Sequence, residues 1–155
     1  MSARYMSIRW WRSLLRQCGG NAAIELALLT PPLVLLAIGT ADYGFGLYQQ
    51  MEVQNAAQAG AEYARKHGFS VNAIGSAITA ATPLTVTATP AATQSCGCPS
   101  GTTITAATCG STCASGATAG TYVTANAQAT YTTLVPYPGI ANSYTLTASS
   151  TVRIQ

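Results

Sequence analysis

IELALLTPPLVLLAIGTA, at residues 24–41, is an apolar run close to the ~20 residues that a helix needs to cross a bilayer. A core helix of a soluble domain would show a polar face, and between Leu26 and Ala41 this run shows none. Four arginines precede it with no acidic residue among them: Arg4, Arg9, Arg12 and Arg16. The positive-inside rule therefore predicts that the N-terminus is cytoplasmic and that the chain is exported after about Tyr43.

Composition limits the classes of protein that fit the exported part. The chain has 155 residues, of which 48% are hydrophobic and only 7% are charged, against about 25% charged in a usual soluble domain. After His67 the only charged residue is Arg153, so the second half lacks the carboxylate, lysine or further histidine on which most soluble enzymes depend. The length suits one compact domain with an appendage. We therefore expect a membrane-tethered protein that is not an enzyme and has no cofactor.

Aromatic residues lie among the N-terminal arginines, at Tyr5, Trp10 and Trp11. Basic residues mixed with aromatics also occur in nucleic-acid-binding segments. An aromatic belt beside a membrane span accounts for the same residues. We expect the membrane explanation to hold and no nucleic acid to be bound.

The basic leader ends at a glycine that stands before the apolar run. Residues 17–25 are QCGGNAAIE, in which Gly20 closes the leader and Glu25 follows five residues later. A secretory signal would instead carry its cleavage site beyond the apolar run. An ionised carboxylate in hydrocarbon is costly and requires a partner. Cleavage after Gly20 would create that partner, the α-amino group of Asn21, so we interpret Gly20–Asn21 as a processing site and Glu25 as an assembly residue.

This arrangement resembles a class III type IV prepilin signal, which a prepilin peptidase cuts on the cytoplasmic face. More of the chain resembles the TadE-like family, the minor pilin-like proteins of the tight-adherence (Tad/Flp) pilus system. The matching stretches within residues 17–67 are Gly20, Glu25, Pro31-Pro32-Leu33, Asp42-Tyr43-Gly44 and residues 55–64. Within residues 120–155 they are 122–125, 131–134, 136–139 and 146–149, ending near Arg153. Leu26 departs from the family, which more often carries an aromatic residue after the glutamate.

The resemblance implies a minor pilin or pseudopilin-like subunit that supports pilus biogenesis and adhesion. It further implies a single-pass protein of the bacterial inner membrane with a periplasmic C-terminal domain. The implied partners are the prepilin peptidase, other pilins or pilin-like subunits, and the Tad assembly platform. The alternative is a stand-alone membrane-anchored adhesin or periplasmic binding module. A plain anchor needs neither Gly20 nor Glu25, so these residues favour the pilin-like hypothesis.

No strong helix breaker occurs between the span and His67, so the sequence predicts one helix over residues 21–67, with a span at about 22–43. Such a helix is ~70 Å long, and Pro31 and Pro32 should kink it. Its predicted end is Arg65-Lys66-His67-Gly68, with cations at the negative end of the dipole and a glycine beyond them.

Small residues recur at helical spacing in the exported half of this helix, in a stripe formed by Val53, Ala57, Gly60 and Ala64. Such stripes allow two helices to approach closely. We expect the stripe to pack against a partner subunit. The alternative is that it receives the protein's own sheet.

Residues 68–155 are predicted to be a mainly β domain. A short helical turn capped by Ser70 comes first, and alternating apolar and polar residues then predict strands at 84–89, 121–134 and 144–154. One face of the middle strand carries Val123, Ala125, Ala127, Ala129 and Tyr131. The predicted fold is therefore α+β: a leader at 1–20, a long helix at 21–67, and a small antiparallel sheet packed on that helix.

Four cysteines lie in a Gly/Ser/Thr-rich insertion at 94–118: Cys96, Cys98, Cys109 and Cys113. A small exported domain with few aliphatic residues usually needs covalent support, so two disulfides are expected. We predict the nested pairs Cys96–Cys113 and Cys98–Cys109, with the other crossing pattern, Cys96–Cys109 and Cys98–Cys113, as the alternative. A zinc site built from the four thiolates is the competing hypothesis.

Overall fold

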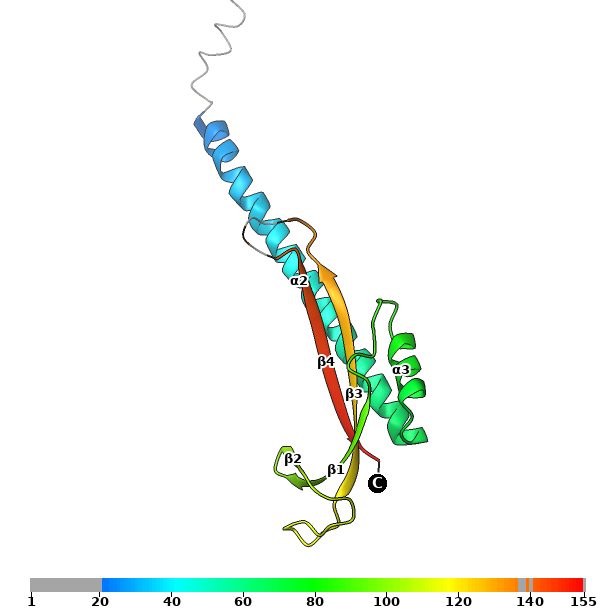
Figure 1. Ribbon diagram of the computed structural model, residues 1–155. Coiled ribbons are helices and arrows are strands. Elements are labelled where there is room, and N and C mark those ends of the chain that lie inside the picture. The colour runs from blue at the N-terminus through cyan, green and yellow to red at the C-terminus, as the bar shows by residue number, and fades with distance from the viewer. Residues whose placement is uncertain (1–20, 137–138, 140, 155) are drawn as a thin grey trace, which may run out of the picture. The chain divides into compact units, whose positions relative to one another are not determined.

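The computed structural model describes residues 21–136, 139 and 141–154 (Figure 1). The elements follow in the order α2 (Asn21–His67), α3 (Val71–Ala80), β1 (Thr93–Ser100), β2 (Thr103–Ala106), β3 (Gly120–Thr132) and β4 (Ser143–Arg153). The chain divides into two units between Ala41 and Asp42. The predicted α+β fold, with a long apolar helix, a small antiparallel sheet and two disulfides, is confirmed.

The described part of the first unit, residues 21–41, is helical throughout and its side chains are almost all exposed. Its apolar window has a mean hydropathy of 2.0 and no buried residue, as a single membrane-spanning helix requires. The Thr30 hydroxyl donates to the Leu26 carbonyl at 2.6 Å and the Thr40 hydroxyl to the Ala37 carbonyl at 2.9 Å. These bonds satisfy the hydroxyls within the helix, which makes two threonines acceptable in hydrocarbon. Pro31 and Pro32 both lie inside the helix.

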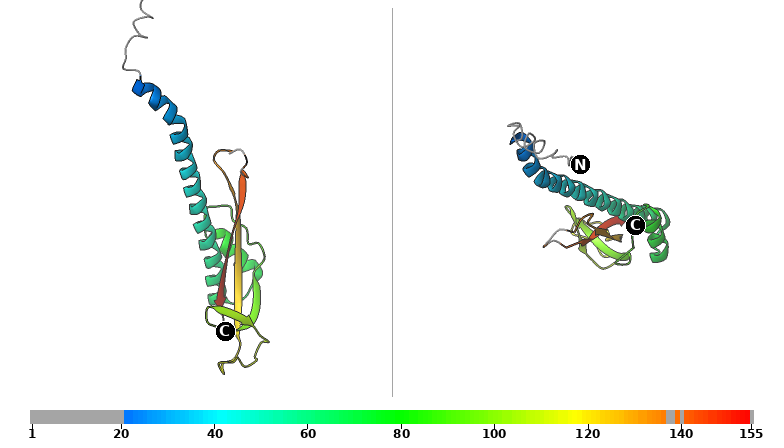
Figure 2. Two further views of the ribbon diagram at one scale, coloured as in Figure 1. Left: turned by 90° about the vertical axis from the view of Figure 1, so that its left-hand side faces the viewer. Right: turned by 90° about the horizontal axis from the view of Figure 1, so that it is seen from above.

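The second unit packs the rest of α2 against the sheet and α3 (Figure 2). Its core is small, because alanine supplies most of the buried side chains. The residues buried from α2 are Val53, Ala56, Ala57, Ala61 and Ala64; those from α3 are Ile74 and Ile78; those from β3 are Val123, Ala125, Ala127 and Ala129. Small side chains allow the helix and the sheet to approach closely, so the domain gains contacts while burying little aliphatic volume.

The predicted stripe of Val53, Ala57, Gly60 and Ala64 is buried inside this core. A Cβ built on Gly60 would lie 2.6 Å from Ile78 Cγ1 and 3.2 Å from Ala125 Cβ. The stripe therefore receives α3 and the chain's own sheet, which is the intramolecular alternative, and it is not open to a partner helix in this fold.

The predicted end of the long helix is confirmed at His67. Gly68 has a φ of 83°, and its N–H donates to the Ala64 carbonyl at 2.8 Å. One turn earlier, Glu62 binds Arg65 at 2.5 Å and Lys66 at 3.2 Å. Hydrogen bonds from Arg65, and then from Lys66, lower the pKa of the Glu62 carboxyl to about 2. The pair is exposed, so its contribution to stability is small and screened by salt.

The four strands form an antiparallel sheet in the order β2-β1-β3-β4. The longest ladder joins β3 to β4, from Tyr122 opposite Arg153 to Thr132 opposite Ser143. The predicted inner face of β3 is confirmed, since Val123, Ala125, Ala127, Ala129 and Tyr131 are all buried. On β4 the residues opposite them are half-buried at Leu146, Ala148 and Val152. The predicted turn at 136–139 falls partly outside the described residues.

The predicted strand at 84–89 is wrong. Only Thr87 pairs with the sheet, through an isolated bridge to Gln128 in which both backbone bonds measure 2.8 Å. Val86 is buried and Leu84 half-buried, so the alternation marks which side chains face the core. Pro83 and Pro90 flank the segment, and a proline cannot donate to a ladder. The place beside β3 is taken by β1 instead, with Thr93 opposite Thr124.

The disulfides join Cys96 to Cys109 and Cys98 to Cys113, with Cα–Cα distances of 5.1 and 5.6 Å. The predicted nested pairing is wrong and the alternative pattern is the one observed. The reason is the register of the β1–β2 hairpin, which turns at Gly101 and places Thr105 opposite Cys98. The Ala107 N–H then donates to the Cys96 carbonyl at 3.0 Å. The chain leaving β2 therefore reaches Cys96 first, and the bridges consume all four thiols of the proposed zinc site.

Candidate functional site

Of the residues predicted for processing and assembly, Asn21 and Glu25 lie at the start of α2. Gly20 is outside the described residues, and the helix begins at Asn21. Glu25 is the fifth residue of the helix and the only ionisable side chain between Asn21 and Ala41. Its pairing with the α-amino group that cleavage would create stays a prediction.

A second candidate site lies where the apolar run ends, and the sequence did not reveal it. Asp42 is only 7% exposed. The Tyr131 hydroxyl donates to its carboxylate and, at 2.9 Å, to its backbone carbonyl oxygen. The Leu134 N–H donates to the same carboxylate oxygen, Oδ1, at 3.0 Å. We name these three residues, Asp42, Tyr131 and Leu134, the Asp42 cluster.

Two elements bring this cluster together. Asp42, Gly46 and Val53 lie on the face of α2 that meets the sheet, as their burial and helical spacing show. Tyr131 is the last inward-facing residue of β3 and lies opposite Tyr144 of β4. A Cβ on Gly46 would be 3.6 Å from the Tyr131 ring, so the ring rests directly on the helix. The cluster therefore ties the end of the β3–β4 hairpin to the helix.

The chemistry of the cluster is that of a structural anchor. A buried carboxylate is costly unless donors satisfy it, and here a hydroxyl and a backbone N–H both do so. Within residues 21–136, 139 and 141–154 no group of three or more His, Cys, Asp or Glu side chains is placed to hold a metal. His67 packs against the Tyr63 ring at 4.6 Å between centroids.

Tyr131→Phe should lower the free energy of unfolding of the domain by about 1–3 kcal/mol, because the buried Asp42 carboxylate loses a donor while the ring packing stays. Urea unfolding of the full chain in mild detergent, followed by near-UV circular dichroism, measures the change. Tyr144→Phe is the matched control, because Tyr144 lies opposite Tyr131 but is 41% exposed. The free energy of unfolding of this variant should equal that of the wild type. Equal effects of the two substitutions would contradict the role of the cluster.

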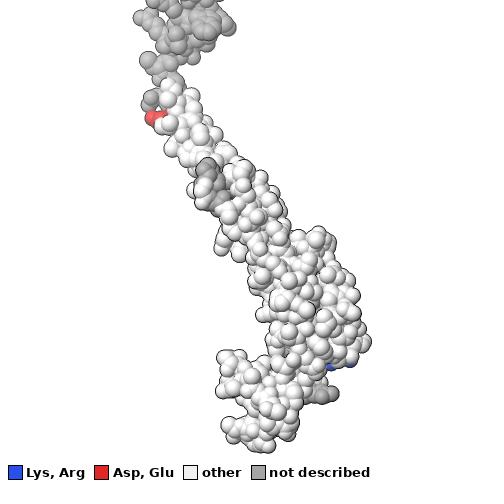
Figure 3. Space-filling model, viewed as in Figure 1, with Lys and Arg blue, Asp and Glu red and all other residues white. Residues whose placement is uncertain are grey.

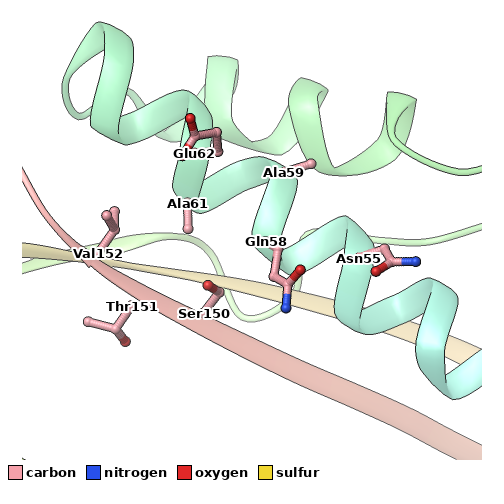
Figure 4. A pocket seen from close by; sticks show the side chains of 8 residues that line it. All are labelled: Asn55, Gln58, Ala59, Ala61, Glu62, Ser150, Thr151 and Val152. Carbon is pink, nitrogen blue, oxygen red and sulfur yellow. The ribbon is translucent and has the colours of Figure 1, made fainter.

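The rest of the surface offers hydroxyl and amide groups with little charge. Figure 3 shows a domain surface that is almost entirely uncharged on the face in view. An open groove of about 530 Å³ runs between α2 and the edge strand β4, and Figure 4 shows its side chains. The groove is lined by Asn55, Gln58, Ala59, Ala61, Glu62, Ser150, Thr151 and Val152. Glu62, the one charged residue among them, already binds Arg65 and Lys66.

Neither the curated proteins nor the solved structures contain a significant match to this chain. A family model, described as TadE-like protein, matches residues 20–62. The match begins at the predicted processing glycine and covers the apolar run, the Asp42 position and most of the buried stripe. The resemblance predicted from the sequence is thus confirmed over residues 20–62, the segment that is similar to the TadE-like family model.

Proposed function

We propose that the chain is a minor pilin-like subunit of a Tad/Flp pilus apparatus, processed after Gly20 by a prepilin peptidase. The observation that carries the proposal is the family match, which starts at residue 20. The TadE-like family is associated with this pilus system, and the single apolar helix supplies the membrane anchor that such a subunit needs before assembly. The subunit supports pilus biogenesis and adhesion, with its N-terminus cytoplasmic and its domain periplasmic.

The surface that contacts neighbouring subunits lies on the outer face of α2. Leu47, Tyr48 and Met51 are each about half exposed and follow one another at helical spacing, away from the buried Val53 and Ala57. They continue the apolar character of the span into the domain. In an assembled fibre this face packs against the helices of other pilins or of the assembly platform.

The processing step is tested by N-terminal sequencing of the envelope protein from cells that express the peptidase. The wild-type chain should begin at Asn21, and Gly20→Ala should accumulate at full length with its leader retained. Gly19→Ala is the matched control, because it changes the adjacent glycine and should leave processing intact. A wild-type protein that keeps Met1 in these cells would show that no such processing occurs.

The assembly role of Glu25 predicts a separate result. Glu25→Gln keeps the shape of the side chain but removes its charge, so the variant should insert into the membrane normally. Losing one partner of a desolvated charge pair costs about 2–5 kcal/mol, so surface pilus output should fall about tenfold or more. Glu62→Gln alters an exposed carboxylate on the same helix and should leave output unchanged. Normal output from Glu25→Gln would favour the alternative function, a membrane-anchored adhesin or binding module.

A further inference from the structure

The second unit begins at Asp42, directly after the apolar run in the sequence. The segment 22–41 supplies 20 residues, which at 1.5 Å per residue equals the ~30 Å thickness of the hydrocarbon layer. Asp42 follows directly and is the first ionisable residue after Glu25. The Asp42 cluster therefore marks the level at which the chain leaves the hydrocarbon.

Four large side chains around this cluster are exposed and apolar or aromatic: Tyr43 (71%), Phe45 (53%), Leu134 (58%) and Tyr144 (41%). Tyr43 and Phe45 point to either side of Asp42 around the helix. Leu134 is held by its own N–H on Asp42, and Tyr144 lies opposite Tyr131 across the β3–β4 ladder. We call these four residues the apolar patch. The patch thus has two members on the helix and two at the end of the hairpin.

We propose that the apolar patch lies in the headgroup layer of the bilayer, so that the end of the β3–β4 hairpin contacts lipid as well as the helix. Tyrosine rings with an apolar body and a polar tip are typical of this layer, and two of the four residues are tyrosines. The sequence from Tyr131 to Val152 contains no charged residue, so nothing on this hairpin opposes contact with the interface. The nearest acid, Asp42, is satisfied by the cluster.

The hydrogen bonds explain how an acidic residue tolerates this depth. An unpaired carboxylate at the edge of the hydrocarbon would be costly. The Tyr131 hydroxyl and the Leu134 N–H supply its donors from the hairpin, and burial at 7% exposure keeps it away from lipid. The same bonds fix Leu134 and Tyr144 at the depth of Tyr43. A lipid surface is present at this level whenever the span is inserted in a bilayer, whereas a protein partner would have to be recruited.

The test places a fluorescent probe on the hairpin of the full chain in vesicles of phosphatidylcholine and phosphatidylglycerol without any other pilus component. Cys18→Ser leaves only an introduced cysteine free for the environment-sensitive NBD label, at Leu134→Cys or, as a second position, Tyr144→Cys. Ile104→Cys on β2 is the matched control, with a similar 43% exposure at the far end of the sheet. Retained disulfides, checked by thiol counting, confirm that each variant is folded.

Lipids with a nitroxide in the headgroup should quench the label at positions 134 and 144 about threefold more than at position 104, with a blue-shifted emission. Quenching by aqueous iodide should be weaker at positions 134 and 144 than at position 104. Equal quenching at the hairpin and control positions overturns the proposal. A label at position 134 that stays open to iodide in these vesicles, and becomes shielded only when pilus proteins are added, overturns it as well, since a protein partner would then cover the patch. The vesicles contain neither peptidase nor pilus, so the outcome does not depend on the proposed function.

Discussion

Replacing Cys98 and Cys113 together by serine is expected to lower the free energy of unfolding of the domain at residues 42–155 by about 3 kcal/mol. Replacing Cys96 and Cys109 together should have a similar effect. The bridges close sequence separations of 15 and 13 residues, so each restricts the unfolded chain by a comparable amount. The core they support consists largely of alanine and contains few large aliphatic side chains. The total free energy of unfolding of a small domain is only about 5–15 kcal/mol. Loss of both bridges should therefore unfold this domain at 37 °C.

Non-reducing urea unfolding in detergent measures these changes. Cys18→Ser is the control, because Cys18 precedes the domain at residues 42–155 and its loss should leave the unfolding midpoint unchanged. Peptide mapping of the unreduced protein should recover Cys96 linked to Cys109 and Cys98 linked to Cys113. Recovery of a Cys96–Cys113 peptide, or of four alkylatable thiols with stoichiometric zinc, would contradict the observed pairing.

The pairing also shows what the sequence lacked. Two bridges were predicted from the expected export and from the small number of aliphatic residues. The choice between the two pairing patterns depends instead on the register of the β1–β2 hairpin. The β1–β2 hairpin turns tightly at Gly101, and its ladder extends only to the pair Gly97–Ala106. Cys109 and Cys113 both follow the end of this ladder. The nested pattern assumed a longer tip that reached Thr108. Spacing alone does not distinguish these hairpins, because both keep all four cysteines close.

Periodicity predicted the faces of the elements better than the ladder partners. The alternation in β3 and the glycine after His67 report local burial and backbone conformation, and both are confirmed. The alternation at 84–89 also reports burial, but the flanking prolines keep that segment out of the sheet apart from the Thr87 bridge. A residue that faces the core need not belong to a strand.

The contacts most distant in sequence were the least predictable. Asp42 and Tyr131 are 89 residues apart in the sequence. The sequence explained Asp42 as part of the family resemblance and Tyr131 as a residue of the inner strand face, so nothing linked the two. One signal could have predicted this contact. An isolated acidic residue at the end of an apolar run needs a hydrogen-bond donor from another part of the chain when it is buried. The small-residue stripe was ambiguous in the same way, since close packing is equally favourable against a partner helix and against the chain's own sheet.

Gly60→Leu should lower the free energy of unfolding by about 3 kcal/mol, the upper part of the range for overpacked cores. Even a Cβ at Gly60 would lie 2.6 Å from Ile78 Cγ1 and 2.9 Å from its Cδ1, and Ile78 is completely buried. On the other side Ala125 lies at 3.2 Å, so neither α3 nor β3 leaves room for the new side chain. Gly60→Ala should be destabilising as well, by about 1–2 kcal/mol, although alanine is the better helix former.

Gly75→Ala provides the matched control, and its effect should have the opposite sign. Gly75 is also a helical glycine of the same domain, but a Cβ there would meet only Ala88 Cβ, at 3.6 Å, which is an ordinary contact. The gain in helix propensity then remains, and the free energy of unfolding should rise by about 0.5–1 kcal/mol. If Gly60→Ala were also stabilising, α2 would not be packed on α3 and β3 as closely as the structure shows. The stripe would then remain available to a partner subunit, as first expected from its spacing.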